Sequence, residues 1–190
     1  MADSNLTKRA LSAALKELMN EQPFVKISVG DICERCEMNR KSFYYHFKDK
    51  YDLVNWIFDT EFLPIALEGS GECDDREKFI MSVCDYFYGN RTFYRKALQI
   101  KGQNSFSDHF REFCLPLLRD RFVYLCGVDI SDDFILNFYT DAAMCAIERW
   151  LLDRDCMPPK ELVYKLKHTV ELGRTAFDKE FNELSQSKNR

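Results

Sequence analysis

Apolar residues recur at every third or fourth position along most of the chain, and this spacing most constrains its fold. Among the 190 residues there are only seven Gly and five Pro, which disfavours an all-β fold with many tight turns. The sequence therefore predicts an all-α protein. The first helix is expected over about residues 5–20, where the apolar positions are Leu6, Ala10, Leu11, Ala14, Leu15 and Leu18.

Capping residues and short breaks divide this pattern into about nine helices. Ser, Asn and Asp favour helix starts, whereas Gly and Pro favour helix ends. A cluster of Gly and acidic residues at 68–75 interrupts the pattern, and Pro116 is expected to kink the helix that contains it. The predicted helices cover about residues 5–20, 28–36, 39–47, 49–67, 75–88, 91–101, 105–126, 132–154 and 160–183.

The two short helices predicted within residues 28–47 are separated by a break of three residues that ends at Asn39. Ser28 followed by Asp31 is typical of a capping box, and Asn39 is a good N-cap. Three short helices with such a break form a helix-turn-helix, whose last helix places its N-terminal residues in the DNA major groove. Arg or Lys there can donate to guanine, for about 1–3 kcal/mol of discrimination per good bidentate pair. The residues at this position are Asn39, Arg40, Lys41 and Ser42.

The remainder of this segment divides into a buried and an exposed set. Phe43 and Phe47 are four residues apart and share one helix face, so we assign them to the core. The exposed set is suited to holding phosphate oxygens, which positions a protein on DNA without reading its sequence. Its members are Tyr44, Tyr45, His46, Lys48 and Lys50.

The distribution of charge supports this interpretation, although the total does not. The formal net charge of the chain is −4, whereas DNA-binding proteins usually carry a basic patch. Residues 40–50, however, hold four basic side chains and one acidic side chain. Taken alone, these residues leave open a second interpretation, an ordinary solvated turn with buried aromatic residues.

From Leu6 to Trp56 the chain resembles the N-terminal domain of TetR/AcrR-type regulators. The resemblance rests on Ser28–Val29, Asp31–Ile32, Met38–Asn39, the run from Ser42 to Phe47, Lys50 and Leu53. It implies a homodimer on double-stranded operator DNA. It also implies phosphate contacts from Ser28, Tyr44, Tyr45, His46 and Lys50, and base contacts from Asn39, Arg40 and Lys41.

One residue departs from the pattern of that family. Glu37 occupies the turn position where the family usually has Gly. We therefore expect a non-Gly residue at positive φ there, which is uncommon in proteins.

The resemblance implies two domains, a helix-turn-helix DNA-binding domain over residues 1–50 and a helical regulatory and dimerisation domain over residues 51–190. In similar proteins the last two long helices pack across a two-fold axis. The alternative is that their apolar residues fill only the core of one chain. The positions suited to a dimer are Phe134, Phe138, Ala142, Ala146, Trp150, Leu162, Leu166, Val170, Leu172 and Phe177.

Two stretches, Ile147–Leu151 and Pro158–Leu162, resemble the subgroup that regulates dihydroxyacetone-kinase operons. In that subgroup the effector can be a partner protein, so the effector expected here is an unknown small molecule or protein. Aromatic residues at helical spacing more often belong to a core than to a pocket. The residues that would line a pocket are Arg91, Tyr94, Arg95, His109, Phe113, Tyr139 and Trp150.

Other functions are disfavoured by what the sequence lacks. Among eight Cys, Cys33 and Cys36 form a C-x-x-C pair, but a zinc site needs about four ligands and the three His add no second spaced pair. No nucleophile–base pair stands at readable spacing, so we expect neither an enzyme nor a cofactor. No signal peptide or membrane span is visible, so we expect a cytoplasmic protein. Together with the resemblance, this predicts a bacterial transcription regulator. The alternative is a helical interaction module or coregulator without its own small-molecule ligand.

Overall fold

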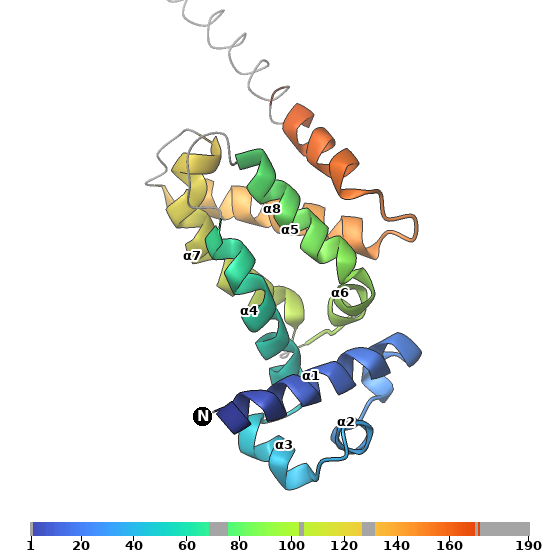
Figure 1. Ribbon diagram of the computed structural model, residues 1–190. Helices are drawn as coiled ribbons and strands as arrows, with labels where there is room; N and C mark the ends of the chain where they lie inside the picture. The colour runs from blue at the N-terminus through green and yellow to red at the C-terminus, as the bar shows by residue number, and fades with distance from the viewer. Residues whose placement is uncertain (1, 69–75, 103–104, 127–131, 170, 172–190) are drawn as a thin grey trace, which may run out of the picture.

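The computed structural model describes residues 2–68, 76–102, 105–126, 132–169 and 171, and the regular elements within these ranges are all helical (Figure 1). The predicted all-α fold is therefore confirmed. The helices are α1 (Ala2–Glu21), the 3-10 turn η1 (Phe24–Lys26), α2 (Val29–Arg35), α3 (Arg40–His46), α4 (Lys50–Glu68), α5 (Arg76–Gly89), α6 (Arg91–Ala97), α7 (Phe106–Cys126), α8 (Asp133–Leu152) and a helix over residues 159–169.

Two predicted helix limits differ from the structure or lie outside it. α6 ends at Ala97 instead of near residue 101. The chain there tightens into i to i+3 hydrogen bonds, from Gln99 N to Lys96 O and from Ile100 N to Ala97 O, and the Ile100 side chain is buried. The last helix was expected to reach residue 183, but the positions after residue 171 lie outside the described residues.

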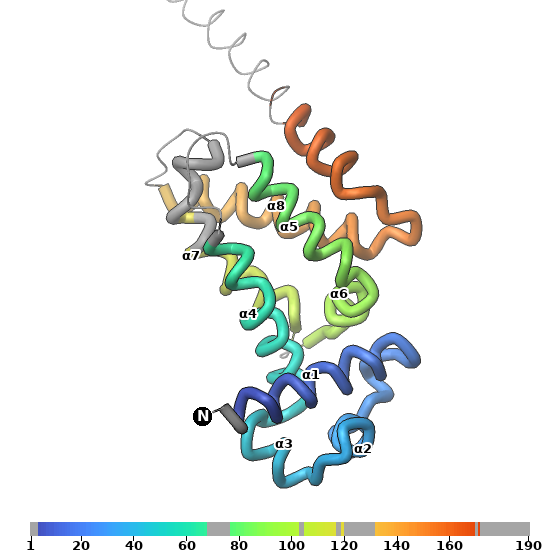
Figure 2. The backbone as a smooth tube through the Cα atoms, in the orientation of Figure 1, coloured from blue at the N-terminus to red at the C-terminus, as the bar shows by residue number. Residues whose placement is uncertain are grey.

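α1, α2, α3 and the first turns of α4 pack together at the N-terminal end of the molecule (Figure 2). Leu6, expected in this core, is largely exposed instead. It lies five residues before Leu11, and five residues turn a helix about 140° beyond one full revolution, so Leu6 points away from the buried face. The core of this N-terminal unit is formed by Leu11, Leu15, Met19, Ile27, Ile32, Phe43 and Leu53.

The second part of the molecule is built around an aromatic cluster centred on Phe58 of α4. The centroid of its ring lies 5.4 Å from Phe106, 5.3 Å from Phe110 and 5.0 Å from Phe113 of α7. All three contacts are T-shaped, an arrangement that aromatic rings favour. α7 also packs along α8, and an ion pair of 2.6 Å between Lys167 and Glu77 joins the helix over 159–169 to α5.

α4 belongs to both parts of the molecule. It starts beside α3 and continues toward α7 as one helix from Lys50 to Glu68 (Figure 2), and its Phe58 lies in the aromatic cluster. The boundary predicted after residue 50 therefore falls at the first turn of a continuous helix, and the division into two domains there stays a prediction. Pro64 lies inside α4 and Pro116 inside α7.

Candidate DNA-binding surface

Local hydrogen bonds set the start of α2 as the sequence predicts. Ser28 Oγ accepts from Asp31 N at 3.2 Å, and Ser28 N donates to Asp31 Oδ2 at 2.8 Å, which completes a capping box. The hydrogen bonds from Ser28 hold the pKa of the Asp31 carboxyl below its usual value. Ser28 is exposed.

The turn between α2 and α3 has the expected backbone geometry. Glu37 adopts a φ of 55°, so the departure from Gly leaves a non-Gly residue in the left-handed region. Met38 N donates to Cys33 O at 2.8 Å, and Asn39 Oδ1 accepts from Ser42 N at 2.9 Å as the N-cap of α3. The side chain of Asn39 thus fixes where α3 begins, and its amide nitrogen still carries two donors.

α3 is anchored by one face and exposed on the other. Phe43 and Phe47 are buried, as predicted. Tyr44 and Tyr45, by contrast, are 58% and 83% exposed. The His46 ring meets Tyr45 edge-on at 4.9 Å between centroids. Two large aromatic side chains on an exposed helix face are unusual for a purely structural helix, because their apolar area remains in water.

The two basic residues at the start of α3 are exposed. The Arg40 guanidinium lies against Gly30 of α2, because a Cβ built on Gly30 would be 2.5 Å from Arg40 Nη2. The absence of a side chain at Gly30 therefore lets Arg40 fold back over the start of α2. Lys41 stands beside it on the exposed side of α3.

Lys48 and Lys50 differ in where their side chains lie. Lys48 is exposed, in keeping with the prediction. Lys50 is turned inward, since its Nζ donates to the backbone oxygens of Phe24, Val25 and Ile27. Lys50 is predicted to hold phosphate, and in this structure its three ammonium protons have acceptors within the chain.

The C-x-x-C pair lies at the end of α2. Cys33 is buried and Cys36 is half-buried, and burial raises the pKa of both thiols. Among the residues that the structure describes, no group of three His, Cys, Asp or Glu is placed to hold a metal ion. Cys33 forms part of the apolar core.

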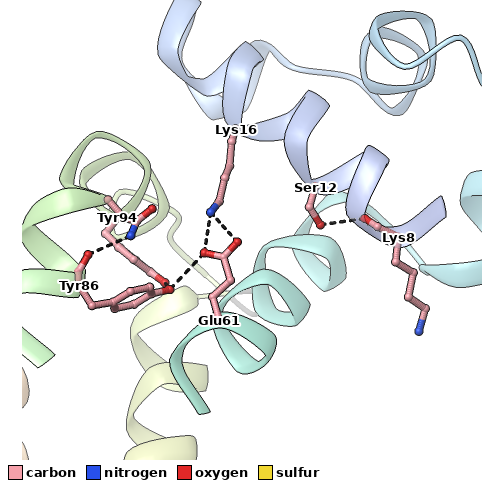
Figure 3. A network of polar contacts seen from close by, with 7 residues as sticks. Lys8, Ser12, Lys16, Glu61, Tyr86 and Tyr94 are labelled. Carbon is pink, nitrogen blue, oxygen red and sulfur yellow. Dashed lines mark hydrogen bonds and ion pairs between the residues drawn. The ribbon is translucent and has the colours of Figure 1, made fainter. Parts of the chain in front are cut away.

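A chain of polar contacts joins the N-terminal unit to the rest of the molecule (Figure 3). Lys16 Nζ of α1 donates to both carboxylate oxygens of Glu61 of α4, each at 2.6 Å. Glu61 Oε2 accepts from the Tyr86 hydroxyl of α5 at 3.4 Å, and that hydroxyl also hydrogen-bonds to the Tyr94 hydroxyl of α6. Burial raises the pKa of both phenols, so both remain protonated and able to donate.

Lys96 of α6 makes a second connection to α1. Its Nζ donates to Met19 O and, at 3.1 Å, to Gln22 O. These carbonyls lie at the C-terminal end of α1, where a cation interacts favourably with the helix dipole. This contact could not be predicted from the sequence, because its partners are 77 and 74 residues away.

Arg95, the residue between Tyr94 and Lys96, holds the end of α8. Its Nε donates to Leu151 O at 2.8 Å and its Nη2 to Asp153 O at 2.6 Å. Three consecutive residues of α6 therefore engage α5, α8 and α1. This short helix is the junction through which the N-terminal unit meets the remaining helices.

Two family models match the chain along most of its length. Residues 11–57 match the bacterial regulatory proteins of the tetR family, and residues 74–172 match a transcriptional regulator C-terminal region of TetR proteins. The chain belongs to the TetR family. It is a DNA-binding transcriptional regulator and not an enzyme, and TetR-family regulators bind operator DNA, usually as dimers.

Individual TetR-family proteins are similar over most of the chain. The HTH-type dhaKLM operon transcriptional activator DhaS of Lactococcus lactis subsp. lactis (strain IL1403) is 28% identical over 156 residues, which are 78% of this chain and 81% of that protein. The structure of the dihydroxyacetone kinase operon activator DhaS superposes with a TM-score of 0.64 at 19% identity, covering 88% of this chain and 95% of the other. A TetR transcriptional regulator from Streptococcus agalactiae 2603V gives a TM-score of 0.67 at 22% identity, covering 90% and 95%. These relatives fit the predicted subgroup.

The residues predicted to line an effector pocket do not gather in one place in this TetR-family chain. Tyr94 and Phe113 pack against Phe58, and His109 Nε2 lies 2.7 Å from Asp59 Oδ1 nearby. These side chains belong to the aromatic cluster between α4 and α7.

The other predicted pocket residues lie elsewhere and have partners within the chain. Arg91 Nη1 donates to Tyr88 O at 3.0 Å, and Trp150 Nε1 donates to Met157 O at 2.8 Å. Arg95 holds the end of α8 as described, and Tyr139 is exposed on α8. The spacing of aromatic and cationic residues along the sequence could not predict that these side chains lie in different places. Backbone carbonyls accept hydrogen bonds from the same side-chain donors that would bind a ligand.

The positions predicted to form the dimer interface differ in how exposed they are. On α8, Phe134 is 76% exposed and Phe138 is 60% exposed, whereas Trp150 is buried. Ala142 is exposed, Ala146 and Leu166 are half-buried, and Leu162 is buried. Val170, Leu172 and Phe177 lie outside the described residues.

Among the described residues, no helix is long and apolar enough to cross a membrane.

Proposed function

We propose that α3 is the recognition helix and that Arg40 and Lys41 read base edges, with Asn39 and Ser42 beside them. The observation that carries this assignment is the two-sided character of α3. Phe43 and Phe47 fix the helix in the core, and the exposed side presents the basic and aromatic side chains. A recognition helix needs such rigid support, because base contacts depend on the position of the helix in the groove.

A second set of residues is proposed to hold the DNA backbone. Its members share exposure or half-exposure around the helix-turn-helix and carry a proton that a phosphate oxygen can accept. Lys50 belongs to this set by its position at the start of α4, and its ammonium also donates to backbone carbonyls of the chain. The set comprises Ser28, Tyr44, Tyr45, His46, Lys48 and Lys50.

We infer that the homodimer forms through α8 and the helix that follows it. Phe134, Phe138 and Ala142 recur at four-residue intervals and are exposed on one face of α8. Adjacent exposed phenylalanines are expected at an interface, because their burial would contribute about 25 cal/mol per Å² of apolar surface. A two-fold dimer would present two copies of α3 to half-sites about 34–36 Å apart.

Control by an effector at the C-terminal domain is the last part of the proposal. The relative DhaS is named as an activator of the dhaKLM operon, and we propose a related regulatory role here, with a small molecule or a partner protein as effector. The contacts of α6 with α1, α5 and α8 give an effector a route to the recognition helices. A partner protein is favoured by the predicted pocket side chains Arg95 and Trp150, which are bound to carbonyls of the chain itself.

The test is DNA binding by a paired substitution on α3. A duplex enriched by the wild-type protein from a random pool is titrated by fluorescence anisotropy with the wild type and with the combined Arg40→Ala and Lys41→Ala variant. We expect the Kd to rise at least tenfold, since tenfold is about 1.4 kcal/mol and one good base contact contributes about that much. Lys101→Ala, an exposed lysine after α6, is the control. An unchanged Kd and sequence preference in the paired variant would refute the assignment.

A further inference from the structure

Gly30 is the second residue of α2, the helix from Val29 to Arg35. Gly is disfavoured within a helix relative to Ala, because it loses more backbone freedom on folding. Among the described residues, positive φ values occur only at Glu37 and Gly102, so the backbone at Gly30 is one that Ala can adopt. If a side chain is excluded at position 30, the cause is what surrounds it.

The space beside Gly30 is filled by the guanidinium of Arg40, the first residue of α3. A Cβ built on Gly30 would lie 2.5 Å from Arg40 Nη2, 3.2 Å from its Cζ and 3.3 Å from its Nε. Apart from the chain neighbours of Gly30 and the backbone of α2, these are the three nearest atoms. Ordinary van der Waals contact begins at 3.4 Å, so a side chain at position 30 would displace the guanidinium by about 1 Å or more.

Contact and charge place the Arg40 side chain on α2 without engaging its donors. Hydrogen bonds with Ser28 are the main cause of the lowered pKa of the Asp31 carboxyl, and the charge of Arg40 lowers that pKa further. Arg40 forms no hydrogen bond or ion pair with the residues that the structure describes. The guanidinium therefore rests in a defined place and keeps all five of its N–H donors.

A donor that reads a base has to be placed accurately. Arg recognises guanine through two hydrogen bonds, to O6 and N7, and the distance between donor and acceptor in such bonds is about 2.7–3.2 Å. A shift of about 1 Å exceeds this range. A side chain that already rests in one place also loses less conformational freedom when it binds.

We propose that Gly30 is a specificity-determining residue that acts through Arg40. The gap that Gly30 leaves on α2 holds the guanidinium where it can meet a base edge with all its donors free. This inference rests on the proposed function, in which α3 is the recognition helix and Arg40 reads bases. A side chain at position 30 is expected to turn Arg40 aside without unfolding the helix-turn-helix.

The experiment is a double-substitution cycle on DNA binding. The wild type, Gly30→Ala, Arg40→Ala and the variant with both substitutions are titrated by fluorescence anisotropy against the duplex that the wild type enriches from a random pool. Gly30→Ala is expected to raise the Kd about fivefold, which is about 1 kcal/mol and within the range for fixing one long side chain. In the Arg40→Ala background it should change the Kd by less than about twofold, because no guanidinium is left to displace.

The sequence preference is the second readout, because a purely structural role of Gly30 would not alter it. From the same pool, Gly30→Ala should lose preference at the position in each half-site that Arg40→Ala also affects, and keep it elsewhere. The matched control is Gly89→Ala. Gly89 is the last residue of α5, and a Cβ built on it meets nothing within 4 Å, so this variant should bind and select as the wild type does.

The outcomes separate this inference from the proposed function. An unchanged Kd and sequence preference for Gly30→Ala overturns the inference, and so does an equal rise in Kd with and without Arg40. A Gly30→Ala protein that does not fold also overturns it, because the guanidinium is then unable to move aside. If the wild type enriches no duplex, or Arg40→Ala binds and selects as the wild type does, it is the proposed function that fails.

Discussion

The ammonium of Lys16 on α1 lies 2.6 Å from both carboxylate oxygens of Glu61 on α4. This pair joins α1, which packs against α3, to α4, which enters the aromatic cluster. Glu61 also accepts from Tyr86, so the buried phenols of the C-terminal part are one hydrogen bond away from it. The orientation of α1 is thereby linked to the packing of α5 and α6.

Substitution Glu61→Gln is expected to weaken this link. The pair is partly exposed, with side-chain exposures of 26% and 36%, so the loss in unfolding free energy should be small, about 1 kcal/mol or less. DNA affinity should fall by about fivefold, which is about 1 kcal/mol, because this link between α1 and α4 is lost. The control is Glu77→Gln, which breaks the exposed pair with Lys167. Equal affinities for the two variants would contradict the link.

Lys96→Met should destabilise the protein more than Lys101→Met. Lys96 donates to two carbonyls at the end of α1, and a hydrogen bond to a charged group contributes about 1.5–3 kcal/mol. Urea unfolding followed by circular dichroism is expected to show a loss of about 2 kcal/mol for Lys96→Met and none for the exposed Lys101. If both variants unfold at the same urea concentration, Lys96 does not cap α1.

Gly30→Ala should leave the protein as stable as the wild type or stabilise it by up to about 1 kcal/mol, since Ala favours a helix over Gly. The nearest atom to the added Cβ would be Nη2 of the Arg40 guanidinium at 2.5 Å, and this flexible end can move toward solvent. A clear fall in Tm would mean that Arg40 is held rigidly on α2. Arg40→Ala alone, measured in parallel, shows how much stability that contact contributes.

The capping box makes α2 sensitive to acid. The pKa of Asp31 is lowered in the folded protein by its hydrogen bonds with Ser28, so its contribution is present above the unfolded pKa and is lost as pH falls through the folded one. Between about pH 5 and about pH 3, the Tm of Asp31→Asn should therefore fall less than that of the wild type. If the Tm of the two proteins falls equally over this pH range, the capping box does not require the charged carboxylate.

The sequence predicted those parts of the site that depend on neighbouring residues. The caps at Ser28 and Asn39 are formed with residues three positions away, and the left-handed Glu37 lies within the same turn. The hydrogen bonds of the Lys50 side chain could not be predicted, because their acceptors are carbonyls 23 to 26 residues earlier. The ion pair of Lys16 with Glu61 could not be predicted for the same reason, because its members are 45 residues apart.

The most direct test of the account is to compare the DNA sequences that the wild type and Arg40→Ala enrich from one random duplex pool. The wild type is expected to enrich inverted half-sites whose centres are about 34–36 Å apart, that is, about 10–10.5 base pairs. Arg40→Ala should retain this spacing and lose the preference for guanine at one position in each half-site. If both proteins enrich the same sequences with equal strength, or the wild type enriches none, α3 does not read DNA as described.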